Sequence, residues 1–193
     1  MKETIRLATK EDSESILDIY SKYIIQTSIT FEVVVPTIKD FEKRIENIIV
    51  SYPYLVYEVG DTIVGYAYAS KHRERAAYCY DVDVSVYFSE AYHNKGKAKI
   101  LYSCLFEILK EQGYYNAYAA YTEPNNKSKR FHEKFNFKAV GIYHKTGYKF
   151  GQWHDVTWLE KEIQPHDANP VPIKTMSEVS KDFINNLFAR YNT

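Results

Sequence analysis

The sequence has little cysteine and no excess of charge of either sign. Its 193 residues include two cysteines, Cys79 and Cys104, and its 25 basic side chains are balanced by 25 acidic ones. The cysteines form no metal-ligand pattern, and a chain of this length needs no disulfide, so a reducing compartment is the default. Proteins whose main partner is nucleic acid usually carry a basic field, and a net charge of zero disfavours that class.

Long apolar runs are also absent. Residues 1–4 lack the apolar core of a signal peptide, and no run approaches the roughly 20 residues that cross a membrane. We therefore expect a cytoplasmic protein without a membrane partner. The chain shows no internal repeat or low-complexity tract, and its length fits one domain with a proper core.

What the sequence does contain is an alternation of apolar patterns typical of a mixed α/β domain with a partly antiparallel sheet. Strands are expected at 4–8, 54–59, 62–69, 78–88, 116–121, 137–143 and 153–162, and helices at 9–25, from 37, from Gly96 to Gly113, and at 128–135. Hairpin turns are expected at Gly60-Asp61 and around Gly147. A breaker-rich linker and a short amphipathic helix follow, so we divide the chain into a domain at 1–162 and a C-terminal extension at 163–193.

One strand–turn–helix segment carries the clearest functional signal. An alternating strand, 80–88, leads through a basic turn into a helix, and the first N–H groups of a helix, together with its dipole, favour an anion. Gly96 permits close backbone approach, and Lys95, Lys97 and Lys99 add positive charge. The segment is neither a Walker loop nor a dinucleotide-binding Gly-x-Gly-x-x-Gly turn. It predicts a phosphate site, with an ordinary helix start and solvated lysines as the alternative.

This segment resembles the coenzyme A pyrophosphate motif of the GCN5-related N-acetyltransferases (GNAT), in which a strand is followed by (Gln/Arg)-x-x-Gly-x-(Gly/Ala) and a helix. Gly96 and Ala98 match the motif, and His93 stands where Gln or Arg is usual. Residues 125–137 resemble the family's second signature, Asn-x-x-(Ala/Ser)-x-x-x-Tyr-Glu-x-x-Gly-Phe, with His132 in the place of Tyr.

The details resemble the phosphinothricin acetyltransferase branch of that family. They are a His-Glu pair at His132, Thr30 beside Phe31, and the run Gly-Tyr-Lys-Phe-Gly-Gln-Trp-His-Asp-Val at 147–156. The resemblance covers residues 4–161. It implies the GNAT fold, a mixed and mostly antiparallel central sheet flanked by helices. It also implies acetyl-CoA as cosubstrate without a metal, direct transfer to a small amine in a ternary complex, and a homodimer.

The resemblance also assigns residues to the cosubstrate. The backbone at the end of the alternating strand is expected to pair with the pantetheine arm and to position the acetyl carbonyl, while the turn and the helix start hold the pyrophosphate. The cofactor-binding residues assigned in this way are Val86, Tyr87, Phe88, Asn94, Lys95, Gly96, Lys97, Ala98, Lys99 and Asn125. For Asn125, an ordinary turn residue before a helix is nearly as good an interpretation.

Transfer to an amine requires that the amine lose a proton, which calls for a carboxylate or a histidine. Asp81 and Asp83 are two residues apart on a strand and therefore share a face. Asp83 stands where the branch usually has Glu, so we assign it as the base. Because its side chain is one methylene shorter, it is expected to act through a water or together with Asp81. His132 is the second catalytic candidate, as a catalytic or substrate-orienting group. Solvated strand carboxylates and a structural histidine are the alternatives.

Amino-acid-like substrates carry a carboxylate, which calls for planar cationic donors. Arg73 and Arg75 precede the strand of Asp83, and Phe31 and Tyr78 are expected to wall the substrate cleft; a charged loop and core aromatics are the alternatives. We therefore expect an acetyltransferase for a substrate of the phosphinothricin, methionine sulfone or methionine sulfoximine type. An acetyltransferase for a polyamine, an aminoglycoside or a protein N-terminus and a non-catalytic acyl-CoA sensor remain as alternatives.

Overall fold

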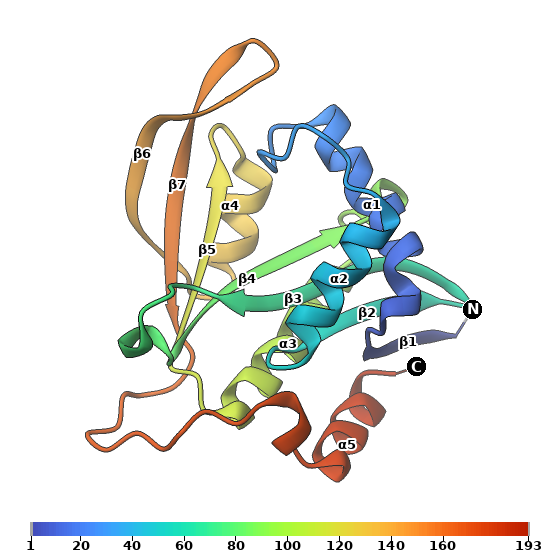
Figure 1. The fold of residues 1–193 in the computed structure, drawn as a ribbon, viewed down its shortest axis with the longest axis vertical. Helices are drawn as coiled ribbons and strands as arrows, with labels where there is room; N and C mark the ends of the chain where they lie inside the picture. Colours follow the sequence, from blue (N-terminus) through green and yellow to red (C-terminus); the bar gives the residue numbers. More distant parts are fainter. Residues whose placement is uncertain (1, 193) are drawn as a thin grey trace.

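A computed structural model describes residues 2–192, which form a seven-stranded sheet with helices on both faces (Figure 1). The strands are β1 (Glu3–Leu7), β2 (Tyr54–Val59), β3 (Thr62–Lys71), β4 (Asp81–Phe88), β5 (Asn116–Thr122), β6 (Lys138–Lys149) and β7 (Gln152–Glu162). The helices are α1 (Ser13–Gln26), α2 (Ile38–Ile49), α3 (Lys97–Gln112), α4 (Asn126–Glu133) and α5 (Lys181–Tyr191). Single 3-10 turns lie at Lys10–Asp12, Ala76–Tyr78, Glu90–Tyr92 and Met176–Glu178.

The sheet has the strand order β1-β2-β3-β4-β5-β7-β6, and its neighbours are antiparallel except for β4 and β5. The parallel pairing of β4 with β5 is short, because it joins only residues 81–83 to residues 116–118. Beyond Asp83, β4 continues beside β3, while β5 continues beside β7. The two strands diverge (Figure 1), so the sheet opens between them on the carboxyl side of Asp83.

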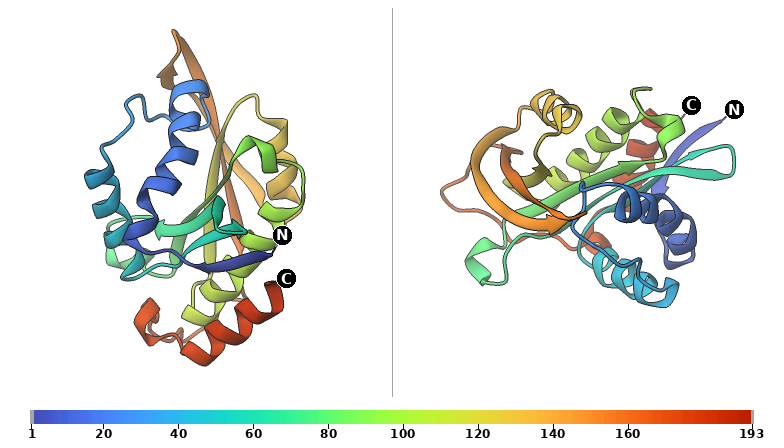
Figure 2. Two further views of the ribbon diagram at one scale, coloured as in Figure 1. Left: turned by 90° about the vertical axis from the view of Figure 1, so that its right-hand side faces the viewer. Right: turned by 90° about the horizontal axis from the view of Figure 1, so that it is seen from above.

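Each face of the sheet has its own core. On one face Tyr66 packs with residues of α1 and α2 such as Ile16 and Ile45, and on the other Val82 and Val84 pack against α3. The view from above in Figure 2 shows α1 and α2 on one side of the sheet and α3 and α4 on the other. The alternation of β4 causes this division, since successive strand residues point to opposite faces.

The mixed, mostly antiparallel sheet expected from the sequence is confirmed, but two local predictions are wrong. β4 begins at Asp81 and not at residue 78, because the preceding residues close a 3-10 turn in which Tyr78 N–H donates to the Arg75 carbonyl. The last hairpin turns at Phe150 and Gly151, which have φ values of 52° and 75°, and not at Gly147. Gly147 instead lies within β6, paired with His154.

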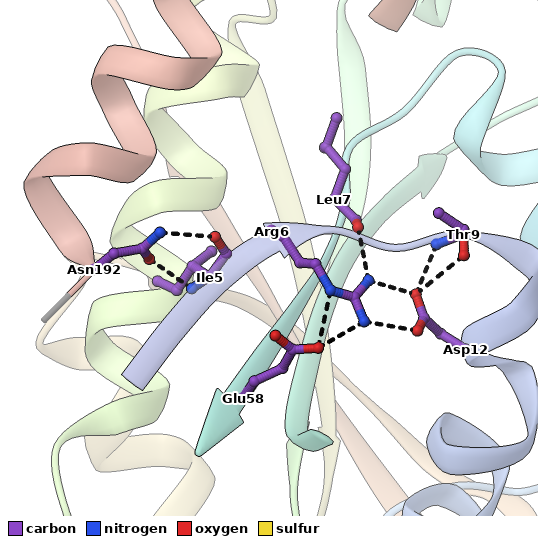
Figure 3. A network of polar contacts seen from close by, with 7 residues as sticks. All are labelled: Ile5, Arg6, Leu7, Thr9, Asp12, Glu58 and Asn192. Carbon is purple, nitrogen blue, oxygen red and sulfur yellow. Dashed lines mark hydrogen bonds and ion pairs between the residues drawn. The ribbon is translucent and has the colours of Figure 1, made fainter. Parts of the chain in front are cut away.

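The C-terminal segment packs onto the domain. The α5 side chains Ile184 and Leu187 belong to the same buried cluster as Leu105 of α3. Beyond the helix, the Asn192 side chain accepts a hydrogen bond from Ile5 N–H at 2.6 Å and so joins the chain end to β1 (Figure 3). Residues 163–192 therefore extend the core of the α3 face.

The first strand is also held on its other side. Arg6 of β1 donates two hydrogen bonds to the Asp12 carboxylate, at 2.7 and 2.8 Å, and one to Glu58 at 2.9 Å (Figure 3). This network joins β1 to the start of α1 and to β2.

Of the helices within residues 2–192, none combines the length and the apolar character needed to cross a bilayer.

Candidate active site

A groove of about 760 Å³ lies where the sheet opens. Its lining comes from the end of β4, the turn at 92–96, the first turn of α3 and residues 125–135, together with Tyr23 of α1 and Ile29. The assigned cosubstrate residues that line it are Val86, Tyr87, Phe88, Asn94, Lys95, Gly96, Ala98, Lys99 and Asn125. The fold therefore joins two sequence segments, 86–99 and 125–135, in one concave site.

The groove is strongly basic in a chain of zero net charge. Among the described residues that line it there is no carboxylate, whereas the cations are Lys95, Lys99, Lys127, Arg130 and Lys134. Clustered cations in a concave surface raise the local concentration of an anion. The arrangement fits a ligand with several negative charges.

The turn before α3 presents backbone donors to this groove. Gly96, the residue that caps α3, has a φ of 78°, Asn94 has a φ of 59°, and no side chain caps the helix. The first hydrogen bond of the turn runs from Lys99 N–H to the Gly96 carbonyl, at 3.0 Å. The N–H groups of the preceding residues have no intrahelical acceptor and can bind an anion. The space in front of Gly96 is open, since a Cβ atom there would meet nothing within 4 Å.

Lys97 is the assigned cosubstrate residue whose side chain the structure turns away from the groove. Its ammonium pairs with Glu3 and lies 5.3 Å from the centre of the Tyr57 ring. Hydrogen bonds from Lys97 and Tyr57 lower the pKa of the Glu3 carboxyl. What Lys97 can offer an anion is therefore its backbone N–H.

The end of β4 is tied to α1 by a small hydrogen-bond cluster. The Tyr23 hydroxyl donates to the Phe88 carbonyl at 2.6 Å, and His93 Nε2 lies 3.0 Å from both of these oxygens. His93, which occupies the position where Gln or Arg is usual, thus folds back onto the strand. It fixes the course of the chain between β4 and the turn.

Asp83 lies at the vertex of the opening, as the last β4 residue paired with β5. Its Oδ1 is 2.7 Å from Nδ1 of His72, and the His72 ring stacks on Tyr118 with 4.0 Å between ring centres. Burial raises the pKa of the Asp83 carboxyl, while the hydrogen bond from His72 opposes that change. A carboxylate held in this way is a suitable proton acceptor beside the groove.

The neighbouring carboxylate is in a different environment. Asp81 Oδ1 accepts a hydrogen bond from the Asn116 side chain at 2.9 Å, and Asp81 lines a second cavity and not the groove. The two acidic residues share a face of β4, as the sequence predicts, but the structure gives them different partners. Asp83 is the one that lies at the opening.

His132 lies on the other face of the sheet, in the groove wall formed by α4. Its Nδ1 is 2.9 Å from the Ser128 carbonyl oxygen, which can only accept, so Nδ1 carries the proton and Nε2 a lone pair. Burial lowers the pKa of this imidazole, and the rings of Phe131, Phe137 and Tyr102 surround it. At neutral pH His132 is therefore an uncharged imidazole in the groove wall, with Nε2 free to accept a hydrogen bond.

Asn125 lies at the start of α4. Its side-chain oxygen accepts from Ser128 N–H at 3.0 Å and caps α4, which is the ordinary role of Asn before a helix. The same residue also lines the groove.

The four residues assigned to the substrate do not lie together. Arg73, Arg75 and Tyr78 line a cavity of about 530 Å³ between the 71–81 connection, the end of α2 and residues 173–175. Tyr78 also approaches His72, with ring centres 6.4 Å apart. This second cavity thus adjoins the His72–Asp83 pair.

Phe31, the fourth residue assigned to the substrate, packs against β6. Its ring lies where a side chain at Gly147 would be, since a Cβ atom there would be 2.2 Å from the ring. The loop 27–36 that carries it is held by Thr122, which donates to the Ser28 carbonyl at 2.6 Å, and by Lys149, which donates to the Thr30 carbonyl at 2.7 Å.

The sequence patterns did not indicate the three basic residues of the α4 segment or His72. Lys127, Arg130 and Lys134 follow one another at spacings of three and four, which places them on one side of a helix and could have signalled the basic wall. His72 gives no such signal. Its meeting with Asp83 depends on the β3–β4 register, in which Ser70 pairs with Asp83.

The opened sheet thus offers a basic groove for a polyanionic ligand at a helix start, with a carboxylate at the vertex of the opening. The model of the acetyltransferase (GNAT) domain matches residues 5–158, and the chain belongs to this family. It is an N-acetyltransferase of the phosphinothricin and methionine sulfoximine acetyltransferase kind.

Its relatives include enzymes with named substrates. It is 31% identical to the phosphinothricin N-acetyltransferase of Streptomyces viridochromogenes, over 91% of this chain and 95% of the relative. It is 29% identical to an L-methionine sulfoximine/L-methionine sulfone acetyltransferase of Salmonella typhimurium, over 86% and 97%. Among solved structures, a phosphinothricin acetyltransferase from Sinorhizobium meliloti in complex with acetyl-CoA is 29% identical. Its TM-score is 0.83, with 94% of this chain and 97% of that chain covered.

Proposed function

We propose that the protein transfers the acetyl group of acetyl-CoA to the amino group of a small amino-acid-like substrate. The substrate is of the phosphinothricin, methionine sulfone or methionine sulfoximine type. The observation that carries this proposal is the groove, whose five cations and lack of a carboxylate among its described residues fit the phosphates of coenzyme A. The names of the relatives and the solved complex with acetyl-CoA support the choice of substrate and cosubstrate.

Residues at successive points along β4 and beyond its end are proposed to contact different parts of the cosubstrate and the acceptor. The turn at Gly96 and the α4 cations hold the phosphates, and the backbone of Val86, Tyr87 and Phe88 lines the pantetheine path toward the vertex. A backbone N–H near Tyr87 polarises the acetyl carbonyl. Asp83, directly or through a water, takes a proton from the ammonium of the acceptor.

The chemistry is then a single displacement. The free amine attacks the thioester carbonyl carbon, the C–N bond forms and the C–S bond breaks. The departing thiolate takes up the proton that the attacking nitrogen releases. Because His132 is uncharged with its Nδ1 proton committed to Ser128, its role is to orient a group in the groove through Nε2.

Arg73, Arg75 and Tyr78 are proposed to bind the carboxylate side of the acceptor, because their cavity adjoins the His72–Asp83 pair. Phe31 walls the acceptor site from the loop 27–36, whose Ile29 lines the groove. A cytoplasmic location, expected from the few cysteines, is part of the same proposal.

We also propose that the enzyme is a homodimer that uses the β6 edge. This strand ends the sheet, and its hairpin exposes several large apolar side chains by 49 to 60%. They are Val140, Ile142, Tyr143, Tyr148, Phe150 and Trp153. Large apolar side chains left exposed at a free sheet edge are typical of an interface.

The substrate class is tested by a thiol-release assay with acetyl-CoA and a panel of amines. We expect release of coenzyme A with phosphinothricin, methionine sulfone or methionine sulfoximine. Release only with a polyamine, an aminoglycoside or a peptide N-terminus would contradict the proposed substrate. Binding of acetyl-CoA without release for any amine would instead support a sensor.

Asp83→Ala tests the base. We expect kcat/KM for the amine to fall at least about tenfold, because general-base catalysis is lost. The affinity for acetyl-CoA, measured by calorimetry, should stay nearly unchanged, since Asp83 does not line the groove that holds the phosphates. Unaltered turnover of this variant would contradict the assignment of Asp83 as the base.

A further inference from the structure

We propose that His72 is the positioning residue of the catalytic carboxylate. Its Nδ1–H holds Oδ1 of Asp83 and leaves Oδ2 for the ammonium of the acceptor. The inference rests on the proposed function of Asp83 as the base, and it adds to the site a residue from the end of a different strand. The pair consists of a β4 carboxylate and the imidazole that directly follows β3.

The contacts of His72 restrict its ring to one orientation. Tyr118 of β5 stacks on it with an interplanar angle of 13°, and Tyr78 meets it edge-on at 76°. With 9% of its side chain exposed, the ring has little room to turn. An imidazole fixed from two sides can in turn fix the carboxylate to which it donates.

The chemistry of the carboxylate decides which atom of the His72–Asp83 hydrogen bond carries the proton. In the ionised form that its role as a base requires, the Asp83 carboxylate only accepts hydrogen bonds, so Nδ1 of His72, 2.7 Å away, is then the donor. Asp83 is the more exposed member, with 36% of its side chain accessible against 9% for His72. The carboxylate is therefore the member of the pair that an acceptor can reach, and the imidazole is the shielded one.

A hydrogen-bond donor is useful beside Asp83, because this side chain is short and half-buried. Burial favours the neutral carboxyl, which cannot accept a proton, and the donor on His72 favours the ionised form. The other groups that act on Asp83 are Arg73, Asp81, Tyr68 and Tyr118. Arg73 works in the same direction as His72, whereas Asp81 works against it.

Two variants separate the hydrogen bond from the aromatic packing. His72→Phe keeps a ring for Tyr118 to stack on but has no donor, whereas His72→Asn loses the ring and keeps an N–H near the place of Nδ1. We expect His72→Phe to lower kcat about tenfold or more, and to move the acid limb of its pH profile to higher pH. The KM for acetyl-CoA should not change. His72→Asn should keep most of the activity and the wild-type limb.

The opposite ranking would overturn the proposal. If His72→Phe is as active as the wild type while His72→Asn is impaired, the residue serves packing alone. Thermal unfolding of both variants shows whether a loss of activity comes from a loss of fold. An active His72→Phe beside an inactive Asp83→Ala would refute the role of His72 and leave the proposed function intact.

A readout without turnover covers the case in which no amine of the panel is acetylated. Nitrogen-15 spectra of the imidazoles report which ring nitrogen is protonated, and the His72→Phe spectrum identifies the signal among the six histidines. We expect the Nδ1–H form for His72 in the wild type and its loss in Asp83→Ala. A wild-type signal with the proton on Nε2 alone would contradict the proposed contact.

Discussion

At the scale of single residues, the proposed base Asp83 lies where burial makes its charge costly. Its charged form is disfavoured by burial, and the pKa of its carboxyl is raised in the folded protein. Between the ordinary pKa of an aspartate and this raised value, the folded state binds more protons than the unfolded state. The free energy of unfolding therefore falls as pH rises through that interval, and the cost persists above it.

Removing this charge should stabilise the protein. We expect Asp83→Asn to raise the melting temperature at neutral pH, because an amide oxygen still accepts from His72 without a buried charge. The gain should shrink as pH falls through the raised pKa of Asp83 toward the ordinary pKa of an aspartate, about 4, because the carboxyl is then already neutral. Thermal unfolding across this range measures the difference, with Asp61→Asn in the exposed β2–β3 turn as the control. A lower melting temperature of Asp83→Asn at neutral pH would show that the carboxylate stabilises the fold.

The sequence could indicate Asp83 and could not indicate its partner. The alternation of 80–88 places Asp83 on one face of a strand, and this needs only the period of two. The contact with His72 needs the strand register and the rotamers of both side chains, which come from packing against Tyr118 and Tyr78. For the same reason Lys97 was assigned to the anion, while its side chain lies on Glu3.

At the scale of elements, α4 supplies the basic wall of the groove. We expect the double variant Arg130→Gln/Lys134→Gln to raise the Kd of acetyl-CoA about tenfold, since charge-assisted contacts to phosphate are lost. The salt dependence of binding should weaken as well. Calorimetry at two ionic strengths measures both effects. Lys129→Gln is the matched control, because Lys129 lies on the same helix and outside the groove lining. Equal losses in the control and the double variant would contradict a specific role for this wall.

The contact between β6 and the loop 27–36 gives a second prediction at this scale. Gly147→Ala should displace Phe31, since the new Cβ atom would lie 2.2 Å from its ring, and overpacking of this kind costs about 1–3 kcal/mol. We expect lower stability in urea and a higher KM for the amine. Gly141→Ala on the same strand is the control, because a Cβ atom there meets nothing within 4 Å. A Gly147→Ala protein with wild-type stability and KM would show that the Phe31 contact is not needed.

The order of the elements was predictable, and some of their ends were not. The helix of α3 ends at Gly113 in the left-handed conformation, as a glycine after an apolar helix predicts. Gly147 was expected to turn the last hairpin, yet it serves a close approach of Phe31, and Phe150 and Gly151 make the turn. A glycine suits either purpose, and the sequence alone does not distinguish them.

At the scale of the whole molecule, the exposed β6 edge bears on assembly. We expect the wild type to be a dimer in solution and Val140→Lys to be a monomer, because a charge on this edge opposes its burial. Light scattering after size-exclusion chromatography measures the mass. Val171→Lys makes the same change at an exposed valine of the C-terminal segment and should leave the dimer intact. A wild-type monomer, or a Val140→Lys dimer, would contradict the proposed interface.

The opening beside β4 has a consequence for how long the protein survives in the cell. Beyond Asp83, β4 has β3 as its strand neighbour on one side, and the proposed cosubstrate lies along the other. A ligand that binds only the folded form stabilises it by about 2.7 kcal/mol at a hundred times its Kd. Because proteases act on the unfolded fraction, the lifetime of this enzyme in the cell should rise and fall with the supply of acetyl-CoA.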